Sequence, residues 1–305
     1  MTTPDLLAPA LVLGLVGFSP AQSAGEPFQE WNRPPFVFHY PAILEADARQ
    51  IDASGHRVLP GMAEDLGVPL PPRIDVYILP AAADAPTRRD APDWAAGYVP
   101  YGSTTVVIVR NRLGSYPSWE INGVFVHELT HVLIHTALAD RSRELPRWFG
   151  EGLAMLQSRR WGFRDAIALS TSLISGTDLP LEKISSEFPA GRRAAQGAYA
   201  ESFSFLSHLI QKFGEDTPRR ILAEIGAGKD FFSAFQSVTG HRIASVEEDW
   251  RKSLVWKYRW IPILTANGTL FTGILLLFLL SYAKRRSRNR KIMDSWDRQE
   301  PIDHF

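Results

Sequence analysis

The stretch from Ser118 to Leu138 reads SWEINGVFVHELTHVLIHTAL and is apolar on nearly every face, which is typical of a buried helix. It contains the motif His127-Glu-Leu-Thr-His131, and residues four apart lie one turn apart on the same helix face. Two imidazoles at that spacing can bind one Zn²⁺, and Glu128 beside them can act as a general base toward water. The alternative is a pair of hydrogen-bonded core histidines, but a buried glutamate without a role costs free energy.

A third metal ligand is expected from the next segment, PRWFGEGLA, which runs from Pro146 to Ala154. Pro146 is suited to open a helix, and Glu151 follows in its first turns. The flanking Gly150 and Gly152 let two helices approach closely and let the carboxylate reach the metal. The alternative for Glu151 is a solvated acid that the helix dipole stabilises. With the two histidines, Glu151 completes a set of three ligands that leaves one coordination position open.

Composition excludes several other classes of protein. The 305 residues contain no cysteine, which excludes disulfides, thiol catalysis and thiolate metal sites, so that a metal must be held by histidine and carboxylate. Lys+Arg and Asp+Glu both number 33, so no basic field favours a nucleic-acid partner. The length allows one large domain or two lobes that share a core.

The remaining pattern predicts an α+β fold. We expect a mixed N-terminal α/β lobe over residues 25–117 and a helical catalytic lobe over residues 118–260. The helical lobe includes a helix opened by a capping box at Ser245. Three β-branched or aromatic runs predict strands, and helical spacing predicts a helix that stops at Gly67. These runs are Phe36–Tyr40, Ile74–Leu79 and Thr104–Val109, and the helix is Ala42–Leu66.

The two ends of the chain predict export and a membrane anchor. Residues 1–24 have the short apolar run and small residues of a signal peptide. Ile261 to Ala283 are 23 uncharged residues, which predicts one transmembrane helix. Six basic residues follow this segment and four precede it, so we expect residues 284–305 to form a cytoplasmic basic tail. The expected location is the cytoplasmic (inner) membrane, with the catalytic domain outside the cytoplasm.

His127-Glu-Leu-Thr-His131, followed by Trp148-Phe-Gly-Glu-Gly-Leu-Ala154, resembles the zinc motif of the gluzincin metallopeptidases, which include thermolysin-like enzymes and membrane-associated peptidase MA-like proteins. The resemblance implies Zn²⁺ ligands His127, His131 and Glu151, with Glu128 activating water. It also suggests Tyr199 as the donor that stabilises the oxyanion, although a core tyrosine fits Tyr199 equally well. The strand Thr104–Val109 could be an edge strand that pairs with an extended substrate, or a plain buried strand.

Departures from related families narrow the expected activity. The glycine-rich motif with an amine-binding glutamate, typical of aminopeptidases, is missing, which argues against exopeptidase action. His135 lies two helical turns from His127, about 11 Å, which is too far to bind the same ion. We therefore expect a membrane-anchored zinc endopeptidase that cleaves extracytoplasmic proteins or peptides. The alternatives are a non-catalytic gluzincin-like binding protein at the membrane and, more weakly, a chance motif. The sequence does not define the cleavage specificity or the oligomeric state.

Overall fold

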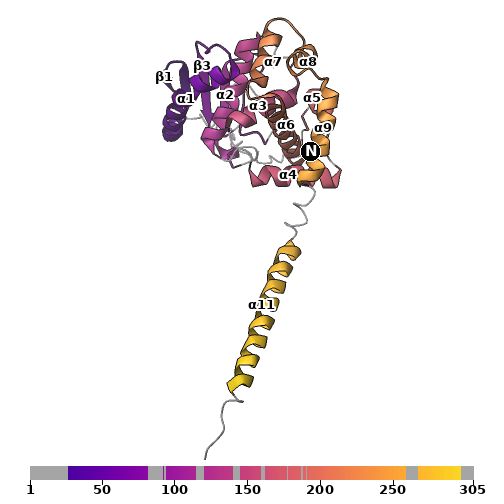
Figure 1. Cartoon of the computed structure of the whole chain (residues 1–305). Helices are drawn as coiled ribbons and strands as arrows, with labels where there is room; N and C mark the ends of the chain where they lie inside the picture. Colours follow the sequence, from indigo (N-terminus) through magenta and orange to yellow (C-terminus); the bar gives the residue numbers. More distant parts are fainter. Residues whose placement is uncertain are drawn as a thin grey trace, which may run out of the picture.

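The computed structural model describes residues 27–81, 92, 94–114, 120–139, 145–158, 162–176, 178–186, 188–189, 191–258 and 267–296. Within these ranges a five-stranded sheet is followed by a helical region, and a long C-terminal helix is drawn apart from both (Figure 1). The predicted signal peptide, residues 1–24, lies outside the described residues.

The sheet has a parallel centre and two antiparallel edges. Its spatial order is β1-β2-β3-β5-β4, with β2, β3 and β5 parallel to one another. The three predicted strands are present, and the structure adds a polar, largely exposed β1 and a two-residue β4 at the edges. The strands are β1 (Gln29–Arg33), β2 (Phe36–Tyr40), β3 (Ile74–Leu79), β4 (Gly97–Tyr98) and β5 (Thr105–Val109).

Of the two alternatives for Thr104–Val109, the buried strand is confirmed and the edge strand is wrong. β5 pairs with β3 on one side and with β4 on the other, and residues 106–109 are fully buried. The apolar run TVVIV has this composition because both of its neighbours exclude water. The expectation that Thr104–Val109 could accept a substrate is therefore wrong, and β4 occupies the edge instead.

Helix α1 (Glu45–Leu66) covers the sheet and meets α2 (Ile121–Leu138). It ends as predicted at Gly67, whose φ of 66° is in the left-handed region that glycine adopts without strain. Gly55 makes the close approach possible, because a Cβ there would lie 2.8 Å from Phe36 Cζ and 2.9 Å from Phe125 Cε1. The two phenylalanine rings lie 5.7 Å apart and join β2 to α2.

The second half of the described chain is helical, and α3 lies between α2 and α6. An aromatic cluster of Trp148, Phe149, Phe205 and Phe231 anchors α3 in the core. The predicted capping box at Ser245 is wrong, because α9 begins two residues earlier, at Ile243, and Ser245 Oγ donates to the Arg242 carbonyl instead. The helices are α3 (Arg147–Ser158), α4 (Phe163–Ser175), α5 (Lys183–Ser186), α6 (Arg192–Phe213), α7 (Thr217–Gly226), α8 (Phe231–Thr239) and α9 (Ile243–Tyr258).

The predicted transmembrane helix is not found. The last helix, α11 (Asn267–Trp296), begins inside the predicted span of Ile261–Ala283, and its second half carries the basic residues that start at Lys284. Residues 261–266 of the predicted span lie outside the described residues. Among the residues that the structure describes, no helix is sufficiently long and apolar to cross a membrane. This corrects the expected fold, which included a membrane anchor.

Candidate metal centre

Helix α2 holds the two histidines rigidly because the helix is buried on most of its surface. Its apolar residues, among them Phe125, Leu129 and Leu133, are fully buried in the core. His127 and His131 project from the remaining face, and their ring centroids lie 5.1 Å apart. The imidazole of His127 is itself buried, with an exposed fraction of only 5% for the residue. The helix therefore presents two nitrogen ligands in a fixed relation.

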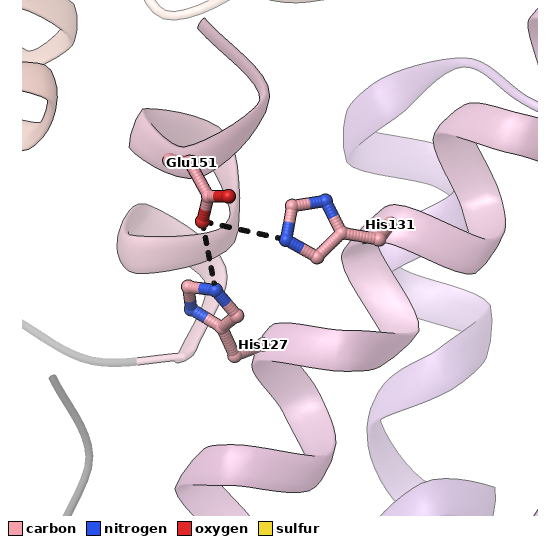
Figure 2. A group of neighbouring side chains, drawn as sticks. All are labelled: His127, His131 and Glu151. Carbon is pink, nitrogen blue, oxygen red and sulfur yellow. Dashed lines mark hydrogen bonds and ion pairs between the residues drawn. The ribbon is translucent and has the colours of Figure 1, made fainter. Parts of the chain in front are cut away.

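Glu151 reaches both histidines from the neighbouring helix. Figure 2 shows its carboxylate on α3 pointing at the two imidazoles of α2. The Oε2 atom lies 3.2 Å from His127 Nε2 and 3.5 Å from His131 Nε2. One ligand atom from each of the three residues lies within 4.8 Å of the others. The structure thus brings together the three residues that the sequence predicts as metal ligands.

The spacing of these atoms fits a tetrahedral ion. Ligand atoms about 2.0–2.1 Å from a zinc ion at tetrahedral angles are separated by about 3.3 Å. The two oxygen–nitrogen distances of 3.2 and 3.5 Å bracket this value. Two imidazoles and one carboxylate are also the ligand types of hydrolytic zinc sites that keep a position open for water. The residues present therefore fit Zn²⁺.

Electrostatics keeps the carboxylate of Glu151 ready to bind a cation. Burial by itself raises the pKa of Glu151, but the charge of His131 and hydrogen bonds from both imidazoles outweigh burial, and the net shift of the pKa is downward. For His131, burial lowers the pKa, yet the attraction of Glu151 outweighs it and the net shift is upward. The carboxylate of Glu151 is therefore ionised, which is the form in which a carboxylate binds a metal.

Glu128 lies next to the ligands and next to the edge strand. It is 6% exposed, and burial raises the pKa of its carboxyl. Gly97 of β4 makes room for it, because a Cβ at Gly97 would lie 2.8 Å from Glu128 Oε1 and 2.5 Å from Val124 Cγ1. A carboxylate with a raised pKa accepts a proton more readily than an exposed one. The carboxyl of Glu128, with its raised pKa, therefore lies beside the three clustered residues.

The ligands open into a cleft of about 310 Å³ that both lobes line. Tyr199 of α6 lies at its His127 side, with the two ring centroids 6.2 Å apart. Phe188 and Trp94 pack on Tyr199 at centroid distances of 4.9 and 6.4 Å. The predicted role of Tyr199 as an oxyanion donor stays a prediction, but the residue does line the cleft beside the ligands.

His135 also lines the cleft, one turn beyond His131 on α2. It does not join the three-residue cluster, which agrees with the distance argument from the sequence. Burial, followed by the charge of His131, lowers its pKa to about 4, so the ring is neutral at physiological pH. It packs against Tyr101 at a centroid distance of 5.4 Å.

Sequence reasoning missed two residues of the cleft that the structure makes prominent. Gly97 lies against Glu128, and Arg147 lines the wall in the first turn of α3. Gly97 is a weak signal in the sequence, because the close approach that requires a glycine is made to α2, a helix nearly 30 residues later. Arg147 could have been found from its spacing, since it precedes Glu151 by four residues and so shares its helix face.

Comparison with known proteins agrees with this geometry. The profile of the Peptidase MA superfamily matches residues 55–256, which is more than half of the chain. A Bacillus subtilis (strain 168) protein named "Uncharacterized protein YhcO" is 24% identical over 135 residues, covering 42% of this chain and 40% of that protein. The match spans well under two thirds of the relative. On the extent of the profile match, the chain belongs to the Peptidase MA superfamily.

Proposed function

We propose that the chain is a zinc-dependent endopeptidase that cleaves proteins or peptides. The observation that carries the proposal is the group of three ligand atoms within 4.8 Å of one another, from His127, His131 and Glu151. Glu128 lies beside the group, and a cleft leads to it. Membership of a peptidase superfamily supports peptide bonds as the substrate class.

In this proposal Zn²⁺ is held by the two imidazoles and the Glu151 carboxylate, and when bound it polarises the scissile carbonyl and acidifies water. Glu128 takes the proton from the attacking water at its carboxylate and returns it to the leaving amine. The raised pKa that burial gives Glu128 supports the first transfer, since a stronger base accepts the proton more readily. The same burial excludes bulk water, which strengthens electrostatic stabilisation in the cleft.

Tyr199 is the proposed donor to the oxygen that gains negative charge. Its half-buried ring contacts His127, and its helix α6 packs against α3, which carries Glu151. Phe188 and Trp94 hold the ring edge-on from two sides. A phenol held in this way needs little reorganisation to donate a hydrogen bond, which is the requirement for transition-state stabilisation.

The edge strand β4 is the proposed binding surface for the substrate backbone. Among the described residues β4 is the last strand of the sheet and pairs with β5, and Gly97 brings it directly over Glu128. An extended peptide that added to this edge of the sheet would place its backbone along the cleft. The described residues that line the cleft include two carboxylates, Glu128 and Glu151, and no third one to bind a free amino terminus. This favours cleavage within a chain over aminopeptidase action.

The test compares zinc content and hydrolysis in three proteins. The wild type is expected to purify with one zinc per chain and to cleave a quenched peptide library. Glu128→Gln should keep the zinc and lose about 10²–10⁴-fold in kcat, because it removes the base and leaves the ligands. His131→Ala should lose both zinc and activity. Equal cleavage by the wild type and Glu128→Gln would contradict the mechanism, and a wild type without zinc would contradict the metal site.

A further inference from the structure

Arg147 lies in the first turn of α3 and lines the same cleft as the ligands. Residues four apart on a helix share a face, so Arg147 lies one turn from Glu151 on the side that faces the cleft. Its side chain is exposed and lies close enough to His131 for its charge to act on that ring, although burial and Glu151 have larger effects and the net shift of the His131 pKa is upward. Arg147 is therefore placed on the His131 side of the ligand cluster.

The position of this arginine is not explained by the stability of the fold. A cation in the first turn of a helix is disfavoured, because the dipole places positive partial charge there. Glu151, the acid at the favourable four-residue spacing, is directed at the two histidines instead. Among the described residues, none forms an ion pair with Arg147. The guanidinium thus faces the cleft with its charge and donors available.

The described part of the wall around Arg147 offers little else for a charged ligand. Of the described residues that line the cleft, Arg147 alone carries a permanent positive charge. Its neighbours at this end are Leu145 and Pro146, and farther along α2 are Ile134 and the neutral ring of His135. The opposite end, around Tyr199, is aromatic. One end of the cleft therefore suits an apolar side chain and the other end suits an anion.

We propose that Arg147 binds a carboxylate of the substrate, so that the cleft selects peptides with an acidic side chain or a free C-terminus on the His131 side of the scissile bond. This inference rests on the proposed peptidase function and names the substrate class of that site. A guanidinium forms two parallel hydrogen bonds with a carboxylate, and these bonds are stronger than neutral ones. Loss of such a contact is expected to change binding by about tenfold or more.

The experiment uses zinc-loaded full-length protein and a set of quenched peptides with a fixed scissile bond. Each peptide carries one Glu at a different position, beside a matched Gln peptide, and a further pair has a free or an amidated C-terminus. The Glu scan and the C-terminal pair distinguish a side-chain carboxylate from a terminal one. The variants are Arg147→Gln, Arg147→Glu and the control Arg220→Gln, which changes an exposed arginine in the first turns of α7.

The wild type and Arg220→Gln should prefer the carboxylate peptide about tenfold or more in kcat/KM at one position. Arg147→Gln should abolish the preference by lowering kcat/KM for the carboxylate peptide to that for its Gln partner, and Arg147→Glu should favour a Lys peptide at that position. No preference in the wild type, or the same preference in Arg147→Gln, overturns the inference while the peptidase function stands.

A binding measurement separates this inference from the proposed function. Fluorescence anisotropy gives the dissociation constants of the same peptides for Glu128→Gln, with and without Arg147→Gln. If no peptide is cleaved by the wild type, an Arg147-dependent preference in binding still supports the carboxylate site. Equal binding of Glu and Gln peptides overturns it.

Discussion

Gly97 has no side chain at the point where β4 passes Glu128. The space is filled instead by the Glu128 carboxylate and by Val124, which a Cβ would approach to 2.8 and 2.5 Å. Contacts that short require a neighbour to shift. The glycine thus sets the position of the proposed base, although it has no chemistry of its own.

We expect Gly97→Ala to displace Glu128 and to lower kcat by about 10²-fold, because misplacing a catalytic group by about 1 Å has effects of that size. Zinc content should stay at one per chain, since the three ligands lie on α2 and α3. Steady-state kinetics and metal analysis check both values. Gly61→Ala on α1 is the control, because nothing lies within 4 Å of a Cβ there. Normal kcat in Gly97→Ala would show that the site tolerates the shift.

At the scale of elements, the two glycines that flank Glu151 have different roles. A Cβ at Gly152 would lie 2.8 Å from the Ser202 carbonyl oxygen and 3.2 Å from Leu206 Cβ, so this glycine allows α3 to approach α6. A Cβ at Gly150 would meet only Leu145 Cδ2, at an ordinary 3.8 Å. The sequence suggested a close approach for both glycines, and the structure restricts it to Gly152.

The alanine variants of these glycines should therefore change stability in opposite directions. Gly152→Ala is expected to lower the free energy of unfolding by about 1–3 kcal/mol, because overpacking against backbone outweighs the gain in helix propensity. Gly150→Ala should raise it by up to about 1 kcal/mol, since propensity acts there without a clash. Urea denaturation measures both values. A Gly152→Ala protein as stable as the wild type would mean that α6 moves freely away from α3.

The elements also show which part of the structure the sequence can predict. Local sequence signals predicted β2, β3 and α1 within a few residues. The two strands are recognised from their buried apolar and aromatic residues, and α1 is recognised from its helical spacing and the glycine that ends it. The order of strands in a sheet depends on contacts between residues far apart in the sequence. The position of β5 between β3 and β4 was therefore missed. The two histidines were predicted from helical spacing and Glu151 from the following segment, and the structure brings the three together. Arg147 was overlooked although its four-residue spacing from Glu151 is a local signal.

For the whole molecule, Glu201 links three parts of the helical region. This residue of α6 is 1% exposed, and its carboxylate accepts from Ser172 Oγ of α4 at 3.1 Å and from the Leu179 amide at 3.2 Å. Arg251 of α9 also holds this segment by donating to the Leu179 carbonyl and to Asp178. Burial raises the pKa of Glu201 to about 7, while the hydrogen bonds and Arg251 act in the opposite direction.

Global stability should then depend on pH through Glu201. Between pH 4.5 and about 7 the folded protein keeps a proton on Glu201 that the unfolded chain has lost, so the free energy of unfolding falls as pH rises through this window. The full shift corresponds to roughly 3 kcal/mol. Relative to Glu201→Gln, the wild type should lose about this stability between pH 4.5 and 8, measured by chemical denaturation. The exposed Glu215→Gln is the control, and parallel curves for the wild type and Glu201→Gln would contradict the assignment.

The division of the proposed metal ligands between two helices has a consequence for the affinity of the site for its ion. His131 and Glu151 are separated by 20 positions, and closing a flexible loop of that length has an entropic cost of roughly 3 kcal/mol. In this fold the loop is already closed, because α2 and α3 pack through their apolar faces and the aromatic cluster around Trp148. The entropy of closure is therefore lost when the chain folds, and ion capture proceeds without it. Such a preorganised site should bind its ion tightly and release it slowly.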